Sequence, residues 1–202
     1  MSDPLSALLG KRDWLLLDGA TGTSLFAMGL ESGEPPELWN VERPDAVRAL
    51  HDGFIEAGAD LVLTNSFGGS AYRLKLHEAQ GRVHELAEAA ARLARERADR
   101  AGRPVIVAGS VGPTGELLQP VGSLSHADAV AAFEAQIAGL MAGGADVIWA
   151  ETISAEEEMR AAAEAAARQG APFCATLSFD TAGRTMMGVT SAAWAGIATN
   201  LA

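Results

Sequence analysis

Two acidic residues follow short apolar runs and are the side chains of this sequence best placed for chemistry. Asp18 comes directly after residues 14–17 and precedes Gly19 in a turn of small residues. Glu151 follows residues 147–150 in the same way. In parallel α/β folds, ligands bind at the edge formed by the carboxyl ends of the strands. The pattern therefore predicts a ligand site that contains both carboxylates.

Polar residues also follow the other apolar runs. The amide of Asn65 could hydrogen-bond a substrate or a neighbouring carboxylate. Glu116 ends a Gly-containing turn, and Ser178 lies near the end of the last run. Asn65 is therefore a third candidate for substrate binding, and the possible further pocket residues are Thr64, Ser66, Glu116 and Ser178.

A structural role is the alternative for each of the three main candidates. Asp18 could hydrogen-bond its own backbone in an Asx turn. Glu151 could cap the helix that follows it, where an acidic group is favoured. Asn65 could be a buried polar residue that ties two loops together.

Five strand candidates alternate with five helix candidates along the chain. The expected strands are 13–18, 60–65, 104–109, 146–151 and 172–178, and the expected helices are 44–58, 80–101, 125–143, 154–169 and 191–201. Consecutive βα units predict parallel strands joined by right-handed crossovers. Two architectures fit, an open doubly wound sheet or the first five units of an eight-stranded barrel, which usually takes about 250 residues.

Composition narrows the class of protein. The 202 residues suit one domain, and the net charge of −11 argues against a nucleic-acid partner. The arginines between 92 and 103 alternate with acids, which predicts a solvated helix face. Cys174 is the single cysteine and excludes an internal disulfide. No apolar run approaches about 20 residues and the N-terminus does not resemble a signal peptide, so we expect a cytoplasmic protein without a membrane partner.

Six motifs in order carry a resemblance to a known family from about residue 13 to residue 202. They read LLLDGATGT, ELWN, HDGFIEAGADLVLTNSFGGS, GSVGPTGELLQPVGS, GGADVIWAETIS and SFDTAGRTMMGVT. Together they resemble the homocysteine S-methyltransferase family, which includes the homocysteine-binding barrel of cobalamin-dependent methionine synthase and betaine–homocysteine methyltransferase. The resemblance implies an α/β fold, a (β/α)8 TIM barrel. Residues 1–202 would then form the N-terminal part of one homocysteine-binding domain, with strands 6–8 absent.

The resemblance also implies a reaction and a site. A methyl group passes from a small donor or methylcobalamin to the zinc-activated thiol of homocysteine, which gives methionine. Glu151 matches the family glutamate that binds the substrate amino group, while Asp18 and Gly19 line the pocket. Zinc lowers the pKa of the bound thiol and so supplies the nucleophilic thiolate.

The zinc ligands of the family do not match this chain. The family holds zinc with three cysteines, which we expect beyond Ala202, and Cys174 lies inside an expected strand. We therefore expect either a fragment of a longer protein or a truncated relative that binds no zinc and is inactive alone. The methyl donor stays open between betaine, methylcobalamin, S-methylmethionine and other sulfonium compounds. Phe67 is followed by Gly68 and not by a second aromatic residue. This weakens the case for betaine as the methyl donor, because quaternary ammonium groups favour aromatic cages.

Two other kinds of protein remain as alternatives. One is a barrel lyase or aldolase in which Asp18, Glu116 and Glu151 surround Mg²⁺ or Mn²⁺, since these metals prefer carboxylate ligands. The other is a non-catalytic fragment whose barrel is completed by another polypeptide. Open sheet edges expose unpaired backbone groups, so a homo-oligomer is also expected.

Overall fold

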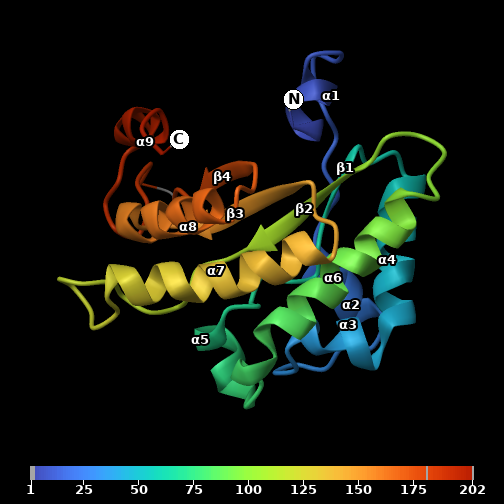
Figure 1. The fold of residues 1–202 in the computed structure, drawn as a ribbon, viewed down its shortest axis with the longest axis horizontal. Helices are drawn as coiled ribbons and strands as arrows, with labels where there is room; N and C mark the ends of the chain where they lie inside the picture. The colour runs from blue at the N-terminus through green and yellow to red at the C-terminus, as the bar shows by residue number, and fades with distance from the viewer. Residues whose placement is uncertain (1–2, 181, 202) are drawn as a thin grey trace.

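The structure, a computed structural model, describes residues 3–180 and 182–201 (Figure 1). Four parallel strands form one sheet in the order of the sequence. They are β1 (Leu61–Leu63), β2 (Ile106–Val111), β3 (Val147–Ile153) and β4 (Phe173–Leu177). Sequential parallel strands with a helix after each are the arrangement of a barrel, so the expected strand order and the barrel-like fold are confirmed.

The long helices begin and end at the residues that the sequence marks. Pro44 and Asp45 open the first turn of α4 (Pro44–Glu56), and Gly58 follows its end with a φ of 105°. The remaining long helices are α6 (Val83–Ala98), α7 (His126–Ala142) and α8 (Glu156–Arg168). Shorter helices are α1 (Pro4–Leu9), α2 (Thr21–Ala27), α3 (Trp39–Glu42), α5 (Ala71–Leu74) and α9 (Ser191–Ala198), with 3₁₀ turns at Pro36–Leu38, Lys75–His77 and Gln80–Arg82.

The sheet is apolar on both faces. On the outer face, Ile148 packs with Phe133 of α7 and Met159 of α8, all fully buried, and α6, α7 and α8 lie side by side (Figure 1). On the inner face, residues such as Ile106 pack against α1 through Leu5. Because side chains alternate between the faces of a strand, the inner-facing positions near the carboxyl ends carry the polar groups of the site.

The prediction of a strand at residues 13–18 is wrong. This segment pairs with β1 through the single parallel bridge between Leu17 and Leu61, and it is not a continuous strand. The carboxylate of Asp60 accepts the N–H of Leu16 at 3.1 Å and also binds Arg12 at 2.6 Å, so side-chain bonds replace part of the ladder. The segment nevertheless lies next to β1, as the barrel order requires.

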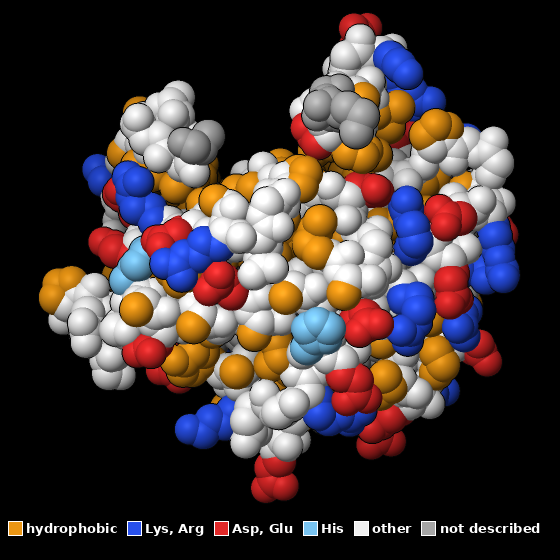
Figure 2. All heavy atoms as spheres, in the orientation of Figure 1, with side chains coloured by type: hydrophobic (Ala, Val, Ile, Leu, Met, Phe, Trp, Pro, Cys, Tyr) orange, Lys and Arg blue, Asp and Glu red, His pale blue; other side chains and the backbone are white. Residues whose placement is uncertain are grey.

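The charged surface over α4 and α6 is mixed. Figure 2 shows Lys and Arg side chains interspersed with Asp and Glu over the side where these helices lie. Arg97 of α6 pairs with Asp52 of α4 at 2.7 Å, and Arg95 pairs with Asp146 at 3.1 Å. Arg92 and Arg100 are exposed, as the expectation of a solvated helix face requires, whereas Arg95 and Arg97 are partly buried in their ion pairs. Within the described part of the chain, no helix is long and apolar enough to cross a membrane.

Candidate functional site

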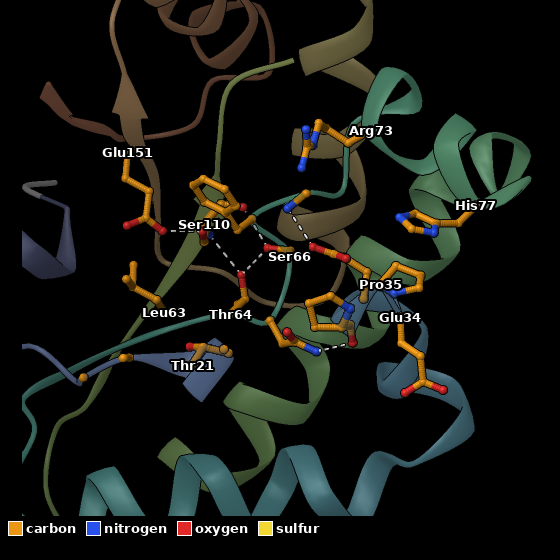
Figure 3. Close-up of a pocket in the computed structure, with 18 of the residues that line it drawn as sticks. Thr21, Glu34, Pro35, Leu63, Thr64, Ser66, Arg73, His77, Ser110 and Glu151 are labelled. Atoms are coloured by element: carbon orange, nitrogen blue, oxygen red, sulfur yellow. Dashed lines mark hydrogen bonds between the residues drawn. The ribbon is translucent and has the colours of Figure 1, made fainter. Parts of the chain in front are cut away.

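A cavity of about 470 Å³ lies where β1, β2 and β3 end (Figure 3). Its walls include the turn after the 13–18 segment, the loop before α3, and the loop that follows β1. The charged and polar side chains that line it are Thr21, Glu34, Glu37, Thr64, Asn65, Ser66, Arg73, His77, Ser110 and Glu151. The cavity therefore lies at the edge of the sheet where the sequence predicted a ligand site.

Glu151 projects from the inner face of β3 into this cavity. Its Oε1 accepts a 2.6 Å hydrogen bond from the hydroxyl of Ser110, on the neighbouring strand β2. Burial raises the pKa of Glu151, and the bond from Ser110 acts against that rise. Oε2 receives no hydrogen bond from the described residues, so it can accept one from a ligand.

The backbone next to Glu151 is unusual. Thr152 has a φ of 62°, and the pairing of β3 with β4 shifts between Ala150 and Ile153. A β-branched residue in the left-handed region is strained, and such strain clusters at functional sites. Bulges of this kind re-aim side chains next to active sites, and here the shift flanks the carboxylate that enters the cavity.

Asp18 lies beside the cavity, at the start of the turn that lines it. Its Oδ2 accepts a 2.8 Å bond from the N–H of Leu63, which ties the 13–18 segment to β1. Its Oδ1 is buried without a hydrogen-bond partner among the described residues. Burial, followed by repulsion from the charge of Glu151, raises the pKa of Asp18 to about 7. An unpartnered buried oxygen next to a second carboxylate fits a cationic ligand.

Thr64 and Ser66 are buried and use their hydroxyls within the protein. Ser66 Oγ donates to the carbonyl of Ser110 at 2.7 Å, so it accepts from Thr64 Oγ1, 2.6 Å away. Thr64 Oγ1 in turn accepts the N–H of Ser110 at 3.0 Å. Gln136 of α7 donates to the carbonyl of Ser66 at 2.7 Å. These residues hold the ends of β1 and β2 together and position Ser110.

Asn65 connects the cavity wall to the loop before α3. Its amide donates to the carbonyl of Pro36 at 2.7 Å and to Asn40 Oδ1 at 3.0 Å. Both amide hydrogens are therefore used by the protein, as the structural alternative expected. Glu37 supports the same wall, because Oε1 accepts the N–H of Gly68 at 2.6 Å and the residue is only 4% exposed.

Gly19 lines the cavity, whereas Glu116 and Ser178 line a second cavity of about 710 Å³. The walls of the second cavity include Met186 and Met187, and it shares no lining residue with the first. The structure thus does not bring Glu116 and Ser178 to the cavity that Glu151 lines. The lyase alternative loses its support, because Glu116 is not in the cavity where the metal would lie.

The described residues do not fit a catalytic zinc. They contain no group of three His, Cys, Asp or Glu side chains that could hold a metal ion, whereas such a site needs three converging ligands. Cys174 lies half-buried within β4, where burial raises the pKa of its thiol. Asp18 and Glu151 suit a ligand cation better than a soft metal ion.

Sequence reasoning missed Glu37, Arg73, His77 and Ser110 as cavity residues. Ser110 follows the apolar run 105–108 and Gly109, and this polar residue near a strand end was the available signal. The other three lie on short helices or turns outside the strand-end pattern, so no local signal marked them.

Fold and cavity together define a partial βα barrel with a small-molecule pocket at the carboxyl ends of its strands. Residues 15–201 match the homocysteine S-methyltransferase family, and the chain belongs to that family. It is 38% identical over 183 residues to the homocysteine S-methyltransferase of Escherichia coli K12, and the match covers 81% of this chain and 57% of that protein. It is 34% identical over 188 residues to methionine synthase of Mycobacterium tuberculosis H37Rv, covering 85% of this chain and 16% of that protein.

Solved structures agree with the sequence matches. The metallated form of the homocysteine methyltransferase MmuM from Escherichia coli superimposes with a TM-score of 0.83 at 27% identity, covering 98% of this chain and 75% of that one. Its oxidized form gives a TM-score of 0.82 and covers 99% and 74%. The chain therefore spans only part of the curated relatives that it matches, 57% and 16% of their lengths.

Proposed function

We propose that residues 1–202 form the N-terminal, homocysteine-binding part of a single barrel domain in a homocysteine S-methyltransferase. The proposed reaction of the whole protein transfers a methyl group from a donor to the thiol of homocysteine and gives methionine. The residues of this chain bind and orient the amino-acid end of the substrate. Family membership and the cavity at the strand ends support this role.

The observation that carries the proposal is that Asp18 and Glu151 each have a carboxylate oxygen without a hydrogen bond from the described residues. Oδ1 of Asp18 is buried without a described partner, and Glu151 has one oxygen committed to Ser110 and one without a described donor. Burial and mutual repulsion disfavour two ionised carboxylates here. An ammonium group between them would supply three N–H donors and a compensating charge.

The turn that contains Gly19 is proposed to hold the substrate carboxylate. Gly19, Ala20, Thr21 and Gly22 all line the cavity, and no side chain caps the helix that begins at Thr21. Backbone N–H groups in such a turn can bind an anion. A Cβ at position 19 would lie 3.0 Å from the ring of Phe54, which does not line the cavity, so glycine lets this turn pack closely on α4. Holding both ends of the amino acid orients its thiol.

Calorimetric titration with L-homocysteine tests the proposal. We expect saturable binding that Glu151→Gln weakens about tenfold or more, because a charge-assisted hydrogen bond contributes roughly 1.5–3 kcal/mol. Glu56→Gln is the matched control, since Glu56 is exposed at the end of α4, away from the cavity. Absence of homocysteine binding, or equal loss in both variants, would contradict the assignment.

The remaining proposals concern the setting of the whole protein. We propose that its small-molecule partners are homocysteine and a methyl donor. We also propose that the protein is cytoplasmic and that it self-associates through the open edges of its sheet. Zinc and methylcobalamin remain candidate cofactors of the whole protein, although the described residues do not fit zinc. Sedimentation of the purified chain tests the self-association, and a concentration-independent monomer would exclude it.

A further inference from the structure

The second cavity, of about 710 Å³, is a separate surface that the proposed function does not use. Three segments enclose it: the loop after β2, the turn between β3 and α8, and the hairpin after β4, which an antiparallel bridge between Arg184 and Thr190 closes. Glu151 lines the first cavity and the next residue, Thr152, lines the second. The two cavities are thus neighbours with different walls.

The second cavity is lined by apolar side chains that are unusually exposed. Met186 is 84% exposed, Val121 67% and Leu117 53%, and Phe179 and Met187 are exposed as well. These residues come from two of the three enclosing segments. An exposed apolar patch with polar residues around it marks an interaction site. Methionine side chains are flexible and adapt to different apolar surfaces, as a docking site for another protein requires.

The charged side chains that line this cavity are all acidic. They are Glu116, Glu156, Glu157, Glu158 and Asp180. Arg160 pairs with Glu156 at 2.7 Å, and the other four form no ion pair with a described residue. Arg184 of the hairpin does not line the cavity, and its Nη1 donates to the carbonyl of Gly188 at 3.1 Å. The cavity therefore keeps an excess of negative charge, which attracts a cationic partner.

Glu158 adds a buried acceptor to this acidic surface. The residue is only 5% exposed, and its Oε1 accepts the N–H and the hydroxyl of Thr114 at 2.8 Å and 2.6 Å. Its Oε2 receives no hydrogen bond from the described residues. Buried polar atoms are normally hydrogen-bonded, so this oxygen points to a donor supplied by a ligand. A cationic donor matches it best, because hydrogen bonds between charged groups are the strong ones.

We propose that the second cavity binds a basic amphipathic segment of a partner protein. The apolar side chains of that segment pack on Met186, Val121 and their neighbours, and its Lys or Arg side chains meet the carboxylates. A small organic cation also fits the volume of the cavity, but it would leave Met186 and Val121 exposed. The proposal is independent of homocysteine binding, because the two cavities share no lining residue.

Titration of the full chain with model peptides tests this assignment. The probe is the peptide LKKLLKLLKKLLKL, whose leucines and lysines separate onto two faces of a helix. One counterpart carries glutamate in place of every lysine, and the other carries serine in place of every leucine. The first measures the need for positive charge, and the second measures the need for apolar contact.

Two protein variants remove the two features of the cavity. Met186→Ser removes an apolar contact, and its control is Leu76→Ser, at a residue that is 69% exposed and lines neither cavity. The double variant Glu116→Gln with Glu157→Gln removes two charges, and its control is Glu31→Gln with Glu56→Gln. All four glutamates are exposed, so none of these replacements disturbs the core. Equal urea midpoints for the parent and the variants verify folding.

We expect saturable binding of the leucine–lysine peptide and no binding of either counterpart. Met186→Ser should weaken binding about tenfold, because a buried apolar contact is lost. The double glutamate variant should weaken it at least about threefold and reduce its salt dependence. Both controls should bind as the parent does.

Several outcomes would overturn the proposal. The leucine–lysine peptide would fail to bind, or the control variants would weaken its binding as much as the cavity variants do. Equal binding of the serine counterpart, or displacement of the peptide by spermine, would assign the cavity to a small cation instead. Loss of self-association in Met186→Ser would assign the surface to a second copy of the chain. Failure of homocysteine to bind would contradict only the proposed function.

Discussion

Ser110 Oγ lies 2.6 Å from Glu151 Oε1 and donates a hydrogen bond to it across two neighbouring strands. Ser110 is 1% exposed, so water does not compete for this bond. The bond fixes one oxygen of the carboxylate and leaves the other for a ligand. A binding group held by a buried partner on a rigid strand is already arranged before the ligand arrives.

Replacement of Ser110 should therefore weaken homocysteine binding through Glu151. Ser110→Ala removes the only described donor to Oε1, and we expect about a tenfold loss of affinity at neutral pH. The pKa of Glu151 should rise further, so the loss should be smaller at higher pH. Calorimetry at several pH values measures both effects. Ser123→Ala, on an exposed loop, is the control. Identical titrations for the two variants would show that Ser110 does not contribute to homocysteine binding.

Homocysteine affinity should fall as the pH decreases from 8 to 6. The pKa of Asp18 is raised to about 7, chiefly by burial, so its carboxyl group becomes protonated over this interval. A ligand ammonium binds the ionised form better, and one linked proton changes affinity by at most about tenfold per pH unit. Asp18→Asn should bind more weakly and flatten the profile. An unchanged slope in this variant would show that another group titrates.

Asp18→Asn should also stabilise the folded chain at pH 8. The folded pKa of about 7 exceeds the unfolded value of 3.8, so the stability linked to this group is fully present below 3.8 and is lost as pH rises to about 7. Removing the buried charge should recover a few kcal/mol at most at pH 8 and little at pH 3.5. Urea unfolding measures the difference. Asp13→Asn, at an exposed position, should have no comparable effect.

Thr152→Gly should increase stability by about 1 kcal/mol or less. The φ of 62° disfavours a β-branched residue, and glycine removes this strain although it adds freedom to the unfolded chain. The same exchange at Thr199, where φ is −66°, should not stabilise the protein. Denaturant midpoints compare the two variants. Destabilisation by Thr152→Gly would mean that the side chain contributes more than the strain costs.

The chain of 202 residues should bind no stoichiometric zinc and should not methylate homocysteine by itself. Its described residues lack a cluster of three metal ligands, and Cys174 is half-buried within β4. Elemental analysis of the purified chain, with a methylation assay alongside, measures both properties. The metallated homocysteine methyltransferase MmuM is a suitable positive control. One tightly held zinc per chain would show that the ligands have been misplaced.

The strand pattern was largely predictable because it depends on local composition. The apolar runs and the glycines after the helices predicted β1 to β4 and their order, although β2 begins at Ile106 rather than near 104. Residues 13–18 have the composition of a strand, but their pairing with β1 is limited to one bridge at Leu17, and the N–H of Leu16 is bound by the side chain of Asp60. Backbone pairing depends on a neighbour, and composition does not supply one.

The sequence by itself determined that Asp18 and Glu151 end apolar runs that lead to one edge of the fold, because apolar runs and their ends are local features. Only the tertiary structure decided which polar groups meet there. Ser110 contacts Glu151 from 41 residues away, and Glu37 contacts Gly68 from 31 residues away. Glu116 and Ser178 also follow strands, but they line the second cavity. Strand register and loop paths set these distances, and neither is encoded in the residues next to each group.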